Sequence, residues 1–146
     1  MSKATSATLL LIGLVLGAST GCEPDRSTAR LRESDLPRGY VDQPVAGPLP
    51  AGDIVVSGWA LAAGGMEDIA IYADGRYVDS AVLGFSRPDV AASEPADEAA
   101  PTSGFQLLLS AHKLPTGPVT LLVQARSRSG ATRDLSVMPV IIPSVR

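Results

Sequence analysis

From Gly39 onward the chain is a series of short apolar runs separated by turns rich in Gly, Pro and Asp. In the run Ile54–Leu61 apolar residues occupy successive positions, which predicts a strand with both faces substantially covered. Ile69–Tyr72 and Arg76–Leu83 flank Asp74-Gly75, and an Asp-Gly pair between β-forming residues is a strong hairpin signal because Gly accepts a positive φ. These two runs are therefore predicted to be adjacent antiparallel strands.

The second half of the chain carries three further strand patterns. Phe105–Leu109 is the first, and Val119–Arg126 is the second, with apolar residues at alternate positions that share one face. The following turn requires a left-handed residue, for which Gly130 is the candidate. Arg133–Ile142 is the last strand, and Pro139 restricts it to a sheet edge because proline cannot donate to the hydrogen-bond ladder.

With a short strand near Tyr40–Val45, the pattern predicts an all-β antiparallel sandwich of about seven strands. No helical period persists beyond a turn or two, and the 12 prolines and 14 glycines lie mostly between the apolar runs. The segment Gly84–Ser103 departs from this pattern, since it combines three prolines with four acidic residues. A loop of this length inside a compact domain is either functional or disordered.

The N-terminus has the pattern of a secretory signal. Met1–Ser6 carries one cation, Lys3, and Ala7–Ala18 is an apolar run without charge. This run falls short of the ~20 residues that a membrane-spanning helix needs, so it predicts a cleaved signal rather than a permanent span.

The residues that follow are more specific. Ser19–Cys22 reads Ser-Thr-Gly-Cys and resembles the bacterial lipobox, with Ser19 where Leu is usual. The resemblance implies a signal peptide over residues 1–21 and a mature chain that begins at Cys22, which carries the lipid, including fatty acyl chains such as palmitate. The alternative is that Cys22 is a small apolar residue beside an ordinary cleavage site. Glu23, rather than Asp, after the cysteine implies sorting to the outer membrane in a Gram-negative cell.

Residues 22–38 are predicted to form the lipidated cysteine and a flexible linker. Glu23–Arg38 is rich in charged residues, Ser and Thr, and has no apolar periodicity that could bury a face. A flexible coil of this length spans roughly 20–25 Å, which lifts a domain clear of lipid head groups. The folded domain is then assigned to residues 39–146.

Composition excludes several functions. One Cys and one His cannot supply an intrachain disulfide, a cysteine metal cluster or a multi-histidine zinc site. A net charge of −3 argues against nucleic-acid binding, because affinity for phosphate backbones depends on excess Lys and Arg. We therefore expect no cofactor, no metal and no nucleic-acid partner.

Several landmarks together resemble a bacterial immunoglobulin-like module of secreted and surface-attached proteins. They extend over Gly39–Ile142 and are Tyr40–Pro44, Val56–Leu61, Asp74-Gly75, Arg87–Val90, Gly104-Phe105 and Leu114–Gly117. Where many members have an aromatic-Pro pair and a late His, this chain has Glu94-Pro95 and Pro118. The resemblance implies an Ig-like β-sandwich used for accessory or adhesion purposes, with no catalytic residues to carry over.

The aromatic residues offer one candidate site. Trp59, the sole tryptophan, could be a platform on which a sugar stacks, but its neighbours Gly58 and Ala60 favour a core aromatic packed between the sheets. Tyr72 and Tyr77 flank the hairpin turn and are predicted to pair across it. Few aromatic residues then remain for a sugar-binding surface.

The titratable residues give weaker signals. His112 could act as a general base, yet the spacing supplies no nucleophile or orienting acid, so an exposed turn histidine is favoured. The acidic stretch Asp89–Glu98 could collect oxygen ligands for calcium, but it lacks the spacing of a calcium loop, and a solvated charged loop is favoured. Carboxylate-pair hydrolysis stays open, since nothing singles out two of the 15 acids.

Two further motifs have a structural interpretation. Leu114–Gly117 superficially suggests a sortase signal, but it lacks the intervening residue and is better read as a turn before a strand. Arg126, Arg128 and Arg133 cluster near one turn and form a weak patch that could touch anionic polymer or lipid.

The sequence thus favours a non-catalytic, lipid-anchored protein of the bacterial cell envelope. Its Ig-like module would present loops or a sheet edge to a protein or an envelope polymer. The first alternative is a carbohydrate- or polymer-binding module, which would need exposed aromatic residues. The second is a hydrolase-type enzyme.

Overall fold

The structure is a computed structural model that describes residues 33–144. The signal peptide, Cys22 and all but the end of the predicted linker lie outside the described residues. The first described turn is a 3₁₀ helix, η1 (Glu33–Asp35), and strand β1 follows from Arg38.

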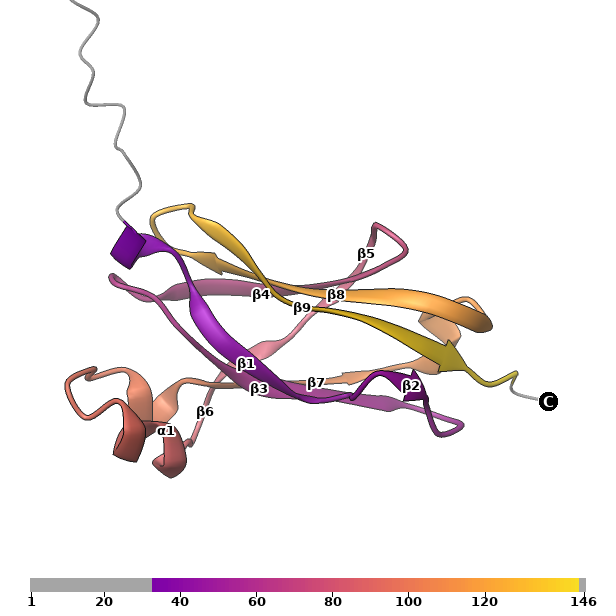
Figure 1. The fold of residues 1–146 in the computed structure, drawn as a ribbon, viewed down its shortest axis with the longest axis horizontal. Coiled ribbons are helices and arrows are strands. Elements are labelled where there is room, and N and C mark those ends of the chain that lie inside the picture. Colours follow the sequence, from indigo (N-terminus) through magenta and orange to yellow (C-terminus); the bar gives the residue numbers. More distant parts are fainter. Residues whose placement is uncertain (1–32, 145–146) are drawn as a thin grey trace, which may run out of the picture.

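Two sheets pack face to face, as Figure 1 shows. The four-stranded sheet has the order β1-β3-β7-β6, and the five-stranded sheet has the order β2-β9-β8-β4-β5. The strands are β1 (Arg38–Gln43), β2 (Gly47–Pro48), β3 (Ile54–Leu61), β4 (Met66–Ala73), β5 (Arg76–Ser80), β6 (Val82–Phe85), β7 (Gly104–Leu109), β8 (Gly117–Ser127) and β9 (Thr132–Ile142). The predicted all-β antiparallel sandwich is confirmed, although residues 33–144 form nine strands rather than about seven and β2–β9 is a short parallel pair.

The single strand predicted at Arg76–Leu83 is wrong. Arg76–Leu83 is not a single strand, because the chain changes sheets at Ala81. Ser80 pairs with Ala70 in the five-stranded sheet, whereas Val82 pairs with Gln106 in the four-stranded sheet. Ala81 is buried at this crossing, where its small side chain lets the chain pass from one layer to the other.

The core between the sheets is almost entirely aliphatic. Alternate residues of β8 point inward, and Val119, Leu121, Val123 and Ala125 are all buried, as predicted. Phe105 is the one aromatic residue among the buried core side chains of residues 33–144. Its ring covers Gly58 on the neighbouring strand, where an added Cβ would lie 2.7 Å from the Phe105 Cζ atom. A side chain at position 58 would therefore displace the ring.

The turns follow the sequence signals closely. Asp74 and Gly75 both have positive φ, at 48° and 78°, as a two-residue hairpin turn requires. Gly130 is left-handed, with φ of 87°. Pro139 lies on β9, which only the two-residue β2 flanks on its outer side, so β9 is an edge for most of its length.

The uncertain segment Gly84–Ser103 is ordered. After β6 it forms the helix α1 (Pro88–Ser93) and the 3₁₀ helix η2 (Ala100–Thr102), and residues 86–103 are called the insertion below. In Figure 1 the insertion lies beside the four-stranded sheet, at the end where the described chain begins. Within residues 33–144 no helix is long and apolar enough to cross a membrane.

Candidate functional site

Trp59 does not lie between the sheets, and that prediction is wrong. On β3, Val56, Gly58 and Ala60 face the core, so strand alternation turns Trp59 to the outer face. There it is half-buried and packs against a second apolar cluster, separate from the main core, formed by Leu61, Val90 and Ala100. The successive apolar residues of β3 reflect this second cluster on the opposite side of the same sheet.

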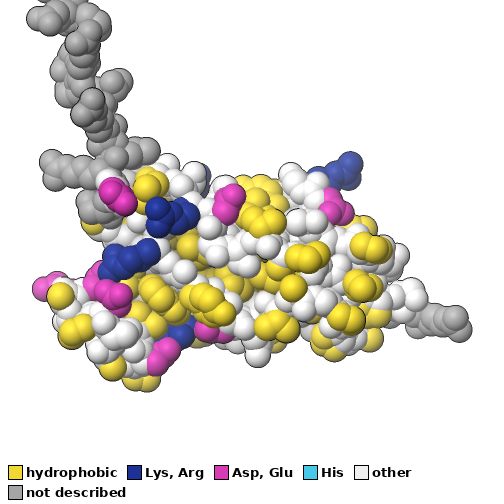
Figure 2. Space-filling model, in the orientation of Figure 1, with side chains coloured by type: hydrophobic (Ala, Val, Ile, Leu, Met, Phe, Trp, Pro, Cys, Tyr) yellow, Lys and Arg dark blue, Asp and Glu magenta, His cyan; other side chains and the backbone are white. Residues whose placement is uncertain are grey.

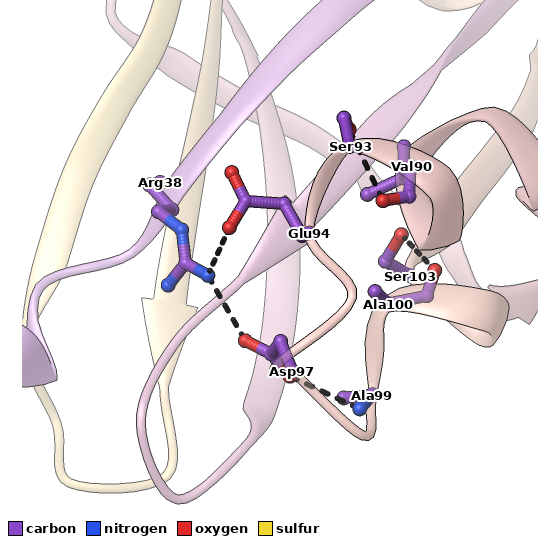
Figure 3. A network of polar contacts seen from close by, with 8 residues as sticks. All are labelled: Arg38, Val90, Ser93, Glu94, Asp97, Ala99, Ala100 and Ser103. Atoms are coloured by element: carbon purple, nitrogen blue, oxygen red, sulfur yellow. Dashed lines mark hydrogen bonds and ion pairs between the residues drawn. The ribbon is translucent and has the colours of Figure 1, made fainter.

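The insertion that carries Val90 and Ala100 is fastened to both ends of β1. At the first end, Nη2 of Arg38 donates to Glu94 at 3.3 Å and to Asp97 at 3.0 Å (Figure 3). Asp97 also accepts a hydrogen bond from the backbone N–H of Ala99, at 3.0 Å. These carboxylates therefore hold the insertion in place.

Arg87 fastens the other end of the insertion. Its Nη1 lies 2.7 Å from Asp42 of β1, and its Nε and Nη2 donate to both carboxylate oxygens of Asp89, at 2.8 and 2.6 Å. The guanidinium of Arg87 holds the pKa of Asp89 at about 2, and the hydrogen bonds that Arg87 donates to Asp89 raise the pKa of Arg87. Its backbone N–H donates to the carbonyl of Pro101 at 2.8 Å.

The prediction of a solvated loop at Asp89–Glu98 is accordingly wrong in part. Asp89, Glu94 and Asp97 are paired with the two arginines, although Asp89 keeps much of its solvent exposure. In the described part of the chain no group of three or more His, Cys, Asp or Glu side chains is placed to hold a metal ion.

The outer face of the four-stranded sheet, called the aromatic face below, is organised in cross-strand rows. One row runs Tyr40, Trp59, Gly104, Phe85 across β1, β3, β7 and β6. Tyr40 is 63% exposed and Phe85 is 42% exposed. The next row consists of Gln43, Ser57, Gln106 and Val82, and beyond it Val55 lies opposite Leu108. Aromatic, polar and aliphatic rows thus follow one another along the strands.

A hollow of about 240 Å³ lies in this face. Ser57, Phe85, Arg87 and Gln106 line it together with Asp42, and Gly58, Gly104 and Phe105 complete its lining. A Cβ on Gly104 would lie 2.7 Å from the carbonyl oxygen of Phe85 and 3.1 Å from Cγ of Arg87. Glycine at position 104 therefore lets the chain around Phe85 and Arg87 approach the sheet closely.

The outer face of the five-stranded sheet differs in its chemistry. Its central row is apolar and runs Val137, Leu122, Tyr72, Tyr77 across β9, β8, β4 and β5. Tyr72 and Tyr77 meet edge to face, with ring centroids 5.9 Å apart, which confirms the predicted pair. Val137 and Tyr77 are 61% and 59% exposed, so this row is open to solvent at both ends.

His112 and the segment Leu114–Gly117 have structural rather than chemical roles. His112 is exposed in the 3₁₀ helix η3 (Ala111–Lys113), as predicted. Its neighbour Lys113 is paired with Asp79 and thereby lowers the pKa of Asp79. Leu114 is buried and Gly117 opens β8 with φ of 93°, so the turn interpretation of Leu114–Gly117 is confirmed.

The three-arginine patch is weaker than the sequence suggests. Arg126 lies 3.3 Å from Glu67 and 3.9 Å from Asp68, so two carboxylates offset its charge. Arg128 borders a different hollow, next to Gly65 and Met66. All three arginines are exposed, and within the described chain Arg126 is paired whereas Arg128 and Arg133 form no ion pair.

The aromatic face was not predicted from the sequence. Most of the aromatic side chains were expected in the core, yet Phe105 alone among the six is buried. The available signal was the alternation Val55, Ser57, Trp59, which places one side of β3 outside the core. Asp42 and Arg87 each lie in a landmark of the Ig-like resemblance, but nothing in the sequence pairs them, since 45 residues separate them.

Comparison with known proteins supports the fold. No protein-family model matches the chain. No curated protein matches it. A solved structure of fibronectin(III)-like modules of Clostridium thermocellum CbhA is similar, with a TM-score of 0.50 and 20% identity, and covers 75% of this chain and 99% of that chain. The similarity concerns the fold, and it agrees with an Ig-like β-sandwich.

Proposed function

We propose that the chain is a non-catalytic, lipid-anchored protein of the bacterial cell envelope that presents its β-sandwich as an interaction module. The observation that carries the proposal is a sandwich with exposed aromatic and apolar side chains on both outer faces, behind a lipobox-like cysteine and a charged linker. Exposed apolar patches on a folded domain are typical of interaction sites.

Anchoring rests on Cys22. The lipid would be attached to its thiol, and the linker would hold the domain a short distance from the lipid head groups. The sorting position Glu23 favours the outer membrane in a Gram-negative cell, with the module facing the periplasm or the surface.

The anchor is tested in cells that make the full chain. Mass spectrometry should find lipid mass on the N-terminal peptide, and the protein should fractionate with membranes. Cys22→Ser should abolish both, whereas Ser19→Leu, which installs the usual lipobox residue, should preserve both. A parent protein without lipid mass contradicts the proposal.

An enzymatic function has less support. In residues 33–144 the side chain of His112 forms no hydrogen bond and lines a hollow with Arg76, Tyr77 and Lys113 but with no serine or cysteine nucleophile. The acids near the insertion are engaged with Arg38 and Arg87. Polymer binding is the second candidate, because the aromatic face supplies the exposed rings that such a function needs.

A further inference from the structure

We propose that the aromatic face binds an uncharged polysaccharide, whose sugar rings stack on Tyr40 and Phe85 and whose hydroxyls hydrogen-bond to the polar row beside them. This inference rests on the interaction module proposed above and names its ligand. The polar row contains Gln43, Ser57 and Gln106, and Val82 ends it at the edge strand β6.

The rings lie where an extended chain could meet both of them. Tyr40 is on β1 and Phe85 is on β6, at opposite edges of the four-stranded sheet and in the same cross-strand row. Three strand intervals of ~4.8 Å separate their backbones by roughly 14 Å. Aromatic rings present an apolar face that stacks against the C–H surface of a sugar while the hydroxyls remain free.

The polar row supplies the hydrogen bonds. Ser57 and Gln106 are cross-strand partners on β3 and β7, and both line the hollow beside Phe85. Within the described chain the structure shows no hydrogen bond from the side chain of Gln43, Ser57 or Gln106, so their donors and acceptors are available to a ligand. Amide and hydroxyl groups both donate and accept, as sugar hydroxyls do.

The charges on this face favour an uncharged ligand. The single positive charge of Arg87 is shared by Asp42 and Asp89, which leaves an excess of one negative charge in that cluster. Arg38, between Glu94 and Asp97, leaves the same excess at the other end of β1. An anionic polymer would be repelled, and the arginines have no free charge with which to attract one.

The order of polar and apolar groups distinguishes a sugar from a protein partner. Protein interfaces have an apolar centre and a polar rim. Here three of the four residues of the middle row, Gln43, Ser57 and Gln106, are polar, Val82 ends the row at the edge strand β6, and apolar side chains lie in the rows on both sides. The five-stranded sheet shows the reverse order, since its central row is apolar, and it suits a protein partner better.

The insertion keeps this face rigid. It covers one side of Trp59, and Arg87 reaches from the insertion to Asp42. A surface held in this way loses little conformational freedom when a ligand binds, which favours affinity. Trp59 lies in the same row as Tyr40, so its fluorescence should report occupancy.

The experiment uses the full chain in mild detergent and a panel of uncharged glucan, mannan and chitin oligosaccharides, with uronic-acid oligosaccharides as the charged comparison. We expect at least one uncharged oligosaccharide to bind and to change the Trp59 emission. Tyr40→Ala and Phe85→Ala should each weaken this binding by roughly fivefold to tenfold. Tyr77→Ala, which removes an exposed ring of the other sheet, should leave it unchanged.

Three results would overturn the inference: no uncharged oligosaccharide binds, only uronic acids bind, or Tyr77→Ala weakens binding as much as Tyr40→Ala does. Thermal melts of each variant separate loss of binding from loss of folding. A second outcome is that no oligosaccharide binds but a protein from native membranes crosslinks to the chain, and Val137→Asp abolishes the crosslink. That result would support the interaction module and exclude the polysaccharide as its ligand. Lipid mass on Cys22 tests the anchor independently of both.

Discussion

Arg87 and Asp42 are 45 residues apart in the chain, and their side chains meet at 2.7 Å across the outer face of the four-stranded sheet. The contact joins the start of the insertion to the edge strand β1. Arg87 also donates to Asp89 through two nitrogens. One side chain therefore links two residues within the insertion and links the insertion to the sheet.

Replacing Arg87 should loosen the insertion. We expect Arg87→Gln to lower the unfolding midpoint by roughly 4–8 °C and to speed proteolytic cleavage within residues 86–103, because a neutral amide cannot satisfy both carboxylates. Calorimetry and timed proteolysis measure the two effects. Arg133→Gln, at an exposed arginine for which the structure shows no ion pair, is the matched control and should change neither. Equal effects of the two variants would contradict the role of Arg87.

Acid should weaken the same contact. The pKa of Asp89 in the folded protein, about 2, lies below its ordinary value, so the unfolded chain binds its proton more readily. The stabilisation is therefore complete above about pH 4 and is lost as the pH falls toward 2. Unfolding midpoints of the parent should fall over this range, and those of Asp89→Asn should fall less. Parallel curves for the two proteins would exclude this linkage.

Trp59 reports on the packing of the insertion. We expect Val90→Ala to destabilise the domain by about 1–3 kcal/mol and to shift the Trp59 emission to longer wavelength, because Val90 is buried in the cluster against which Trp59 packs. Val56→Ala, on the core side of the same strand, should cost a similar free energy without shifting the emission of the native protein. An emission shift in Val56→Ala but not in Val90→Ala would contradict the position of Trp59 on the outer face of the sheet.

Gly58 should not tolerate a side chain. Gly58→Ala places a methyl group 2.7 Å from the ring of Phe105 and also against the backbone carbonyl of Tyr40, so we expect a loss of about 1–3 kcal/mol. Ser57→Ala, one residue away and on the outer face, should stay within about 0.5 kcal/mol of the parent. Chemical denaturation gives both values, and a neutral Gly58→Ala would show that β1 and Phe105 can shift freely.

The sequence was sufficient for the strands whose signals are local. Asp74-Gly75 and Gly130 identified their turns because few residue types adopt a positive φ. The alternation in Val119–Ala125 identified the core face of β8. The switch of sheets at Ala81 has no such signal, since a buried alanine is equally compatible with a continuous strand.

The candidate site was less predictable because it depends on contacts distant in the chain. The side of the sheet to which Trp59 points follows from strand alternation, but the cluster that covers it is built by Val90 and Ala100 of the insertion. The four acids of the stretch Asp89–Glu98 suggested a solvated loop, and only the fold brings Arg38 and Asp42 to that segment. Pairing over such separations cannot be inferred from spacing.

The short parallel pair β2–β9 has a mechanical consequence. Gly47 and Pro48 pair with Val140 and Ile141, and the backbone N–H of Leu49 donates to the carbonyl of Ile141 at 3.0 Å. The described chain begins and ends at opposite ends of the sandwich (Figure 1).

Hydrophobic side chains are spread along the side of the molecule that Figure 2 shows, and many of the charged side chains on that side lie near the insertion.

A pull on the two ends of the described chain would draw β2 and β9 in opposite directions along their common axis. The backbone bonds of the pair would then be loaded together in shear rather than opened one after another. A domain held at one end and pulled at the other would therefore resist extension first at Gly47-Pro48 and Val140-Ile141.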